Sequence, residues 1–191
     1  MKLNKMVLAL GAAFASMARQ KPGCFGAIGG VLNIGDQENK AGPRMPIQSM
    51  WMQPYEITAA VAVTQADHAG RTGVFNVAAG AVVTLPRATG SGAQFSFFCR
   101  TTITSNAMKI QVANADDTIS GVQLTAQDAA DTLVAFETAS TSDTWSGNGT
   151  TTGGIKGDWV TFEDVAPGLW RVLGIGSATG TEATPFSAAV S

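Results

Sequence analysis

The segment Gly157–Gly174, which reads GDWVTFEDVAPGLWRVLG, constrains the fold more than any other part of the chain. Val160 and Phe162 alternate with Thr and Glu before an Ala-Pro-Gly turn, and Trp170 and Val172 alternate with Arg and Leu after it. A period of two is typical of strands with one buried face. Proline and then glycine suit the two central positions of a type II turn. The segment therefore predicts a β-hairpin whose four named side chains face the core.

Composition limits the classes of partner. The 191 residues suit one domain plus an appendage. Charged residues make up 14% of the chain and the net charge is −2, so the surface offers no basic footprint for nucleic acid and no strong acidic field for cationic substrates. Such a surface suits a chain that packs against other proteins. The two cysteines, Cys24 and Cys99, are interpreted as buried small apolar residues rather than as a disulfide.

Candidate catalytic residues are few and isolated. His68 is the only histidine, so a zinc site or a serine, histidine and aspartate triad lacks partners, and we expect a loop residue. Asp116 and Asp117 are adjacent in a predicted turn, which does not suit the acid and base pair of a glycosidase. The glycine-rich run Gly174–Gly180 does not fit the dinucleotide-binding fingerprint. We therefore expect no enzyme activity, no metal site and no cofactor.

The first 18 residues have two interpretations. Lys2 and Lys5 precede an apolar run from Met6 to Ala15, and small residues follow it, which fits a secretory signal. The run is too short to span a bilayer as a stable anchor. We favour the other interpretation, a short apolar helix over about residues 3–18 that docks on a partner surface.

Residues 1–55 are expected to form an extended, mostly irregular N-terminal arm. Prolines at positions 22, 43, 46 and 54, with glycines between them, disfavour a helix or a long central strand. The segment is nevertheless too apolar for a solvated linker. Two interpretations stay open: the arm lies along a neighbouring protein surface, or it packs as coil on its own β domain. The apolar residues available for binding a partner surface are Leu8, Phe14, Phe25, Ile28, Val31, Leu32, Ile34, Met50, Trp51 and Met52.

Residues 56–191 are expected to form an all-β, β-sandwich or jelly-roll-like domain, because short alternating segments are separated by turn residues at regular spacing. The polar run Ser140–Gly154 is predicted to be a flexible exposed loop, in which Trp145 is either a contact residue or folds back over the rim of the sandwich. The expected strands are Ile57–Thr64, Gly73–Val77, Ala81–Leu85, Gln94–Arg100, Met108–Ala113, Val122–Leu124, Thr132–Thr138, Trp159–Val165 and Trp170–Gly174.

Three stretches carry a resemblance to a known class of proteins. They are Gly90–Gly121, which reads GSGAQFSFFCRTTITSNAMKIQVANADDTISG, the hairpin segment above, and the ending GTEATPFSAAV. Together they resemble the small β-rich proteins encoded with capsid genes in tailed bacteriophages, described as decoration, cement or head-fibre proteins. The resemblance covers the chain from about Ile57 to the C-terminus and not the arm.

The resemblance implies a structural virion protein on the outer surface of the capsid, without catalytic residues. The major capsid protein would be its partner, and homo-oligomers, commonly trimers, are implied as well. Neither nucleic acid nor membrane is expected as a partner. The alternatives are an exported carbohydrate-binding module, which the signal-like N-terminus and Trp145 favour, or a tail- or fibre-associated adhesion protein. A small hydrolase with an unrecognised site is the weakest alternative.

Overall fold

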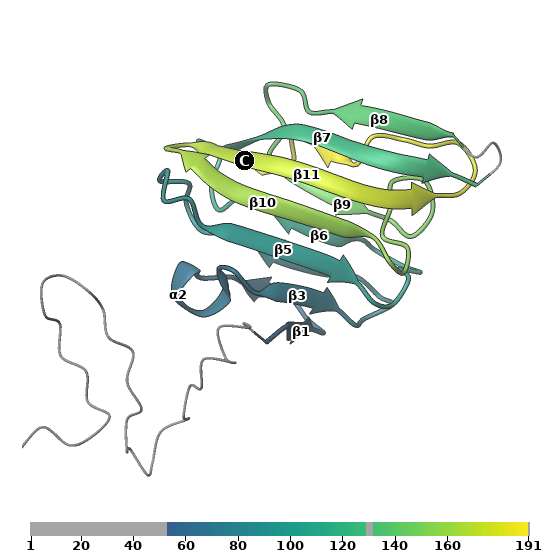
Figure 1. Ribbon diagram of the computed structural model, residues 1–191, viewed down its shortest axis with the longest axis horizontal. Coiled ribbons are helices and arrows are strands. Elements are labelled where there is room, and N and C mark those ends of the chain that lie inside the picture. Colours follow the sequence, from purple (N-terminus) through teal and green to yellow (C-terminus); the bar gives the residue numbers. More distant parts are fainter. Residues whose placement is uncertain (1–52, 129–131, 191) are drawn as a thin grey trace, which may run out of the picture. The chain divides into compact units, whose positions relative to one another are not determined.

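The computed structural model describes residues 53–128 and 132–190 of the chain. The helix expected over residues 3–18, nearly all of the expected arm and Cys24 lie outside these residues. Figure 1 draws the described part in colour and labels its strands.

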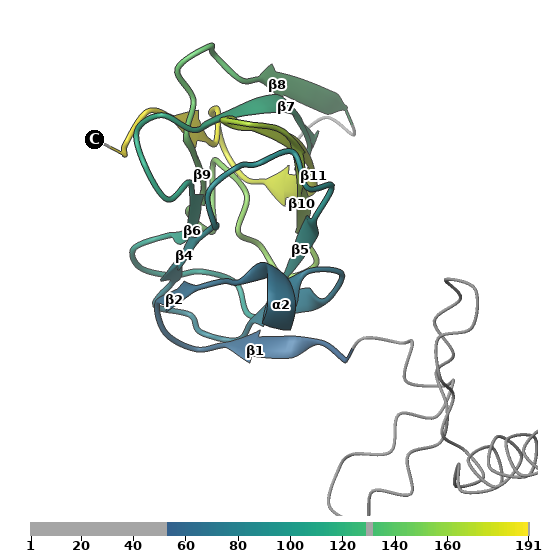
Figure 2. The same cartoon turned by 90° about the vertical axis from the view of Figure 1, so that its left-hand side faces the viewer.

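The described residues fold into two mixed β-sheets that lie one behind the other (Figures 1 and 2). The seven-stranded sheet has the order β1-β3-β5-β10-β11-β7-β8, and the five-stranded sheet has the order β12-β9-β6-β4-β2. The prediction of an all-β fold is confirmed, and the only helix among the described residues is the single turn α2 (Gln65–His68). The strands are β1 (Tyr55–Ile57), β2 (Val61–Ala62), β3 (Thr72–Phe75), β4 (Ala81–Thr84), β5 (Gln94–Cys99), β6 (Met108–Gln111), β7 (Thr118–Gln127), β8 (Leu133–Glu137), β9 (Thr144–Gly147), β10 (Trp159–Ala166), β11 (Leu169–Ala178) and β12 (Phe186–Ser187).

The first six strands alternate between the two sheets. β1, β3 and β5 run parallel in the seven-stranded sheet, and β2, β4 and β6 run parallel in the five-stranded sheet. The chain therefore winds through three successive two-strand turns before the later strands complete both sheets. The alternation pattern predicted two packed sheets but not these parallel ladders.

The predicted hairpin is confirmed as β10 and β11, which pair antiparallel with Phe162 opposite Val172. Gly168 has a φ of +77°, as the predicted turn requires. Val160, Phe162 and Trp170 are fully buried and Val172 is 2% exposed. β10 also pairs with β5, and β11 also pairs with β7, so the hairpin lies in the middle of the larger sheet.

Aromatic rings on the inner face of this sheet form the centre of the core. Phe97 contacts Phe162 at 6.1 Å between ring centroids and Phe75 at 6.3 Å, and Phe95 contacts Trp170 at 5.7 Å. All three pairs are edge-to-face, the arrangement that the charge distribution of aromatic rings favours. Because these rings come from β3, β5, β10 and β11, they tie the parallel ladder to the hairpin.

The prediction of a flexible exposed loop over Ser140–Gly154 was wrong. Four of these residues form β9, and Trp145 is 1% exposed and lies opposite Ile110 of β6. The Trp145 indole Nε1 donates a hydrogen bond to Gln123 Oε1 at 3.2 Å. Threonine, serine and glycine dominate this run, and their loop-like composition hid a buried strand that a distant partner strand stabilises.

Several strand boundaries also differ from the prediction, among them the end of β11, which lies at Ala178 rather than at Gly174. The segment expected as one strand over Ile57–Thr64 contributes β1 to one sheet and β2 to the other, because the chain crosses between the sheets at the exposed residues 58–60. Ala59 and Ala60 have low strand propensity, which suits a crossing point. β7 extends from Thr118 to Gln127, well beyond the predicted Val122–Leu124.

Truncation of Phe162 to alanine tests the role of the hairpin in the core. Removing a fully buried phenylalanine ring should lower the free energy of unfolding by about 3 to 5 kcal/mol, measured by urea denaturation. Thr161→Ala, one residue away on the opposite face of β10, serves as the control and should change stability by less than about 1 kcal/mol. Equal losses for the two variants would contradict the assignment of the inner face.

Candidate binding surface

All ten apolar residues expected to bind a partner, Leu8, Phe14, Phe25, Ile28, Val31, Leu32, Ile34, Met50, Trp51 and Met52, lie outside the described residues. The candidate binding surface among the described residues was not predicted from the sequence. It lies on the outer face of the seven-stranded sheet, the side turned away from the five-stranded sheet and toward the viewer in Figure 1.

One row of apolar side chains crosses six strands of this outer face. The register places a residue of β3 opposite one of β5, and continues through β10, β11 and β7 to β8, always on the same face. On β1 the row ends at Glu56, which lies opposite Val74. We call these six residues the outer row: Val74, Phe98, Trp159, Ile175, Leu124 and Ala135.

Three apolar side chains in or beside the centre of the outer row are substantially exposed. Ile175 is 58% exposed, Leu173 is 44% exposed and Trp159 is 39% exposed. Leu173 lies next to the outer row and opposite Val122 of β7. Single exposed apolar residues are ordinary, but a contiguous apolar patch on a soluble domain marks a contact surface.

The Trp159 ring is held in place by neighbours on the same face. Its Nε1 donates a hydrogen bond to Thr161 Oγ1 at 2.8 Å, and the Thr161 and Ser96 hydroxyls lie 3.2 Å apart. The ring also contacts Phe98 at 6.4 Å between centroids. A ring fixed in this way loses little further conformational freedom when a partner covers it.

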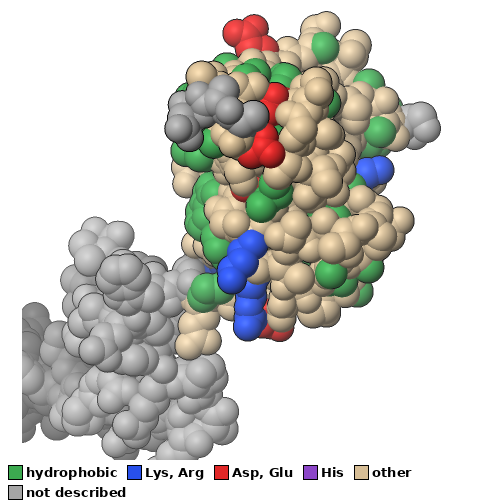
Figure 3. Space-filling model, turned by 90° about the vertical axis from the view of Figure 1, so that its right-hand side faces the viewer, with side chains coloured by type: hydrophobic (Ala, Val, Ile, Leu, Met, Phe, Trp, Pro, Cys, Tyr) green, Lys and Arg blue, Asp and Glu red, His purple; other side chains and the backbone are tan. Residues whose placement is uncertain are grey.

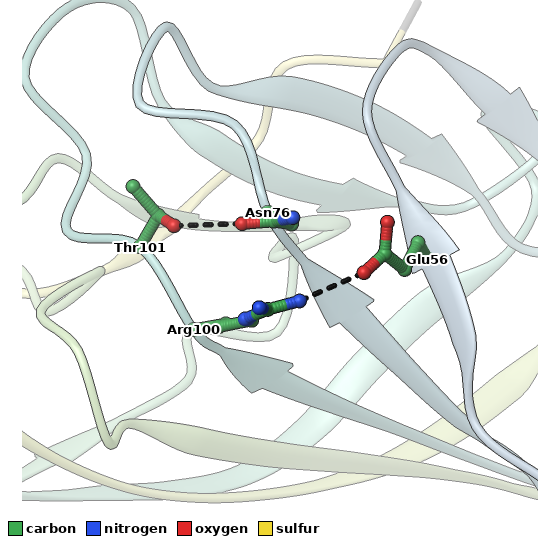
Figure 4. Close-up of polar contacts among 4 residues, drawn as sticks. All are labelled: Glu56, Asn76, Arg100 and Thr101. Atoms are coloured by element: carbon green, nitrogen blue, oxygen red, sulfur yellow. Dashed lines mark hydrogen bonds and ion pairs between the residues drawn. The ribbon is translucent and has the colours of Figure 1, made fainter.

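Two ion pairs within the chain hold most of the charges on the outer face, and Glu137 at its β8 edge is outside both of them. Arg171 and Glu163 form an ion pair at 2.9 Å between β11 and β10. Arg100 reaches toward Glu56 of β1 and pairs with it at 2.8 Å, beside a hydrogen bond of 3.0 Å from Thr101 Oγ1 to Asn76 Oδ1 (Figure 4). At the end of the domain seen in Figure 3, blue Lys and Arg side chains and red Asp and Glu side chains lie among mostly uncharged ones. The outer face is therefore mostly apolar and carries two ion pairs and one further carboxylate.

Asp164 binds a backbone loop rather than a ligand. Its carboxylate accepts hydrogen bonds of 2.7 to 3.1 Å from the backbone N–H groups of Thr89, Gly90 and Ser91 and from the Thr89 and Ser91 hydroxyls. Burial raises the pKa of this carboxyl group, but the hydrogen bonds, first those from Ser91, outweigh burial and lower it to about 2. Asp164 thus fastens the loop between β4 and β5 to the hairpin.

A second buried carboxylate lies near Cys99. Asp158 accepts hydrogen bonds from the backbone N–H groups of Ile155 and Ser177, both within 3.0 Å. Burial nevertheless raises the pKa of Asp158, because the hydrogen bonds only partly offset desolvation. The Cys99 thiol has its pKa raised to about 12, first by burial and then by the charge of Asp158, so it stays a protonated, unreactive thiol at neutral pH. Its predicted burial is confirmed.

The junction with the N-terminal segment is tied down by Arg71. Its Nε donates to the Gln53 carbonyl at 2.8 Å and its Nη1 to the Asp67 carbonyl at 2.7 Å. The guanidinium lies 5.3 Å from the centre of the Tyr55 ring, and burial raises the pKa of Tyr55 to about 12 although Arg71 acts in the opposite direction. The His68 ring packs edge-on against Tyr55 at 4.7 Å. His68 lies in α2 rather than in a loop.

The adjacent acidic residues do not form a catalytic pair. Asp116 is exposed in a turn, as predicted, whereas Asp117 is fully buried. Asp117 Oδ2 accepts hydrogen bonds from the backbone N–H of Ala88 at 2.9 Å and from Asn114 Nδ2 at 3.0 Å. The run Gly174–Gly180 belongs mainly to β11, and its glycine at 176 lies against Asp158, where a Cβ atom would come within 2.7 Å of the carboxyl carbon. Both features serve the fold.

Within residues 53–128 and 132–190, no three His, Cys, Asp or Glu side chains come together as metal ligands. No helix among these residues has the length and hydropathy needed to cross a bilayer. Comparison with protein-family models, curated proteins and solved structures finds no match to the chain.

Replacing Asp164 with asparagine should remove the negative charge that accepts hydrogen bonds from the loop between β4 and β5. Hydrogen bonds to charged groups contribute about 1.5 to 3 kcal/mol, and the new amide N–H would face donors, so Asp164→Asn should cost about 2 to 3 kcal/mol at pH 7. The neighbouring Glu163→Gln is the control and should cost less than about 1 kcal/mol, since it removes only a surface ion pair.

The same variant has a distinctive pH dependence. The folded-state pKa of Asp164 is about 2, below its ordinary value of 3.8. Its stabilising contribution is therefore fully present above pH 4, roughly, and is lost as the pH falls toward 2. The stability difference between wild type and Asp164→Asn, measured by thermal unfolding, should shrink over this interval. A difference that stayed constant over this interval would show that the negative charge of Asp164 does not stabilise the loop between β4 and β5.

Proposed function

We propose that the chain is a structural virion protein, a capsid decoration or cement protein that binds the outside of a phage head and stabilises contacts between capsomers. The observation that carries the proposal is the apolar surface around the outer row, on which Trp159, Leu173 and Ile175 are exposed. The resemblance of residues 57–191 to decoration and head-fibre proteins supports it independently. In this proposal the protein performs no catalysis and holds no cofactor.

The proposal divides the work between the two parts of the chain. A capsid repeats one surface many times, so a modest binding energy at each copy adds up to substantial reinforcement of the shell. A specific contact needs about 800 Å² from each partner, and the apolar side chains of residues 1–55 offer such an area without enlarging the β core. The major capsid protein is the partner of this segment, and the β domain contacts other decorating copies.

The finer description of the domain as jelly-roll-like belongs to this proposal. Two packed sheets support it, although jelly rolls are built from antiparallel strands and β1, β3 and β5 run parallel here. The alternative, a carbohydrate-binding or adhesion module, loses Trp145 as a candidate contact residue because that ring is buried. The half-exposed Trp159 on a flat face is what favours it now.

Deletion of residues 1–52 tests the proposal. The deletion ends there because the Gln53 carbonyl binds Arg71 and β1 begins at Tyr55. The shortened protein should keep the circular dichroism spectrum of a folded β domain and lose sedimentation with capsids that lack this chain. The full-length protein, mixed with the same capsids, is the positive control.

Two outcomes would overturn the proposal that the N-terminal segment binds the capsid. If the shortened protein sediments with capsids as well as the full-length protein does, the N-terminal segment is not the anchor. If the full-length protein itself fails to sediment with them, capsid decoration is wrong.

A further inference from the structure

The outer face of the seven-stranded sheet is a large surface. Its seven strands, spaced by about 4.8 Å, give a width of about 29 Å, and the six steps from Arg171 to Ser177 span about 20 Å along β11. This area of about 600 Å² approaches the roughly 800 Å² per partner that a standard specific interface buries. The face is therefore large enough for a weak, specific protein contact.

The charges on the outer face indicate which kind of partner it can bind. Both arginines on it, Arg100 and Arg171, are already paired with carboxylates of the same face. The face thus has a single carboxylate, Glu137 on the outer strand β8, beyond these two pairs, and offers little charge to a strongly acidic or basic partner. Two identical faces can approach with little charge repulsion, and a symmetric contact between copies requires a surface that is complementary to itself.

The geometry of the outer row suits such a contact. It runs across the strands, with Trp159 and Ile175 opposite each other on the central hairpin. A twofold axis that runs parallel to the plane of the sheet, above this pair and at right angles to the row, brings the apolar row of one copy face to face with the apolar row of the other. Sheets pack in this way, face to face at about 10 Å, in β-sandwiches.

We propose that the outer face of the seven-stranded sheet binds the same face of a second copy of this chain, forming a symmetric pair centred on Trp159 and Ile175. The inference deepens the proposed function, since it names the surface by which decorating copies contact one another. It does not depend on the capsid for its test. The association is weak in free solution, because the area lies at the low end for specific interfaces.

Sedimentation equilibrium of the full-length protein, without capsids, measures this association. Wild type should show a monomer–dimer equilibrium as concentration rises. Ile175→Glu buries an uncompensated charge in the contact and should weaken dimerisation by about tenfold or more. Leu173→Lys is a second variant with the opposite charge and should act in the same direction. Circular dichroism and thermal unfolding must show that both variants fold as wild type does.

Val165→Glu is the matched control. Val165 is 43% exposed, almost the same as Leu173, but lies on β10 beyond Glu163 and about 20 Å along the strand from Trp159. It should leave the dimerisation constant unchanged.

Three results would overturn the inference. The first is a wild-type protein that stays monomeric up to about 1 mM, which would mean a dissociation constant too weak for a specific pair. The second is a trimer. The third is a dimer that Ile175→Glu leaves intact. The Ile175→Glu monomer should still sediment with capsids through residues 1–52. Failure of the pairing and failure of capsid binding are therefore separate observations.

Discussion

The position of the β10–β11 hairpin in the middle of the seven-stranded sheet is the constraint on which the rest of the structure depends. β10 holds the ladder of β5, β3 and β1 on one side, and β11 holds β7 and β8 on the other. Phe162 and Trp170 on its inner face complete the aromatic core, while Trp159 and Ile175 on its outer face form the centre of the exposed row. One alternating segment therefore specifies both the core and the proposed contact surface.

Buried carboxylates fix the loops around this framework. Asp164 binds three successive backbone N–H groups of the loop after β4. Asp143 does the same for the C-terminal tail, accepting hydrogen bonds from the backbone N–H of Ala189 at 2.8 Å and of Val190 at 3.2 Å. Each of these buried acids has hydrogen-bond partners, which the cost of burying a charge requires. In this chain the acidic groups hold the fold together.

The alternation of apolar and polar residues predicted the elements whose partners lie close by in the sequence. The hairpin was predicted correctly because its partner strands follow each other across a short turn. The parallel ladders and β9 could not be predicted in this way, because their strands pair over long sequence distances and Trp145 is buried by contacts from Gln123 and Ile110. Strand pairing of this kind is decided by tertiary packing rather than by intrinsic propensity.

The candidate surface left a signal that the prediction passed over. Trp159, Leu173 and Ile175 occupy the outward positions of the hairpin, where polar residues are usual in a sheet with one solvated face. The role of Asp164 was hard to predict from the sequence, because the Thr-Gly-Ser segment that it binds lies 73 residues or more away along the chain. The expected capsid-binding residues of the N-terminal segment stay a prediction, since they lie outside the described residues.

We propose that the chain joins a capsid through its N-terminal segment and joins its own copies through the outer sheet face. Electron cryomicroscopy of decorated capsids, at a resolution that shows side chains, tests it most directly. We expect density for residues 1–52 against the major capsid protein, and Trp159 and Ile175 of one β domain packed on the same residues of another. Density that placed the outer face in solvent, or the β domain itself against the capsid with residues 1–52 remote from it, would contradict the account.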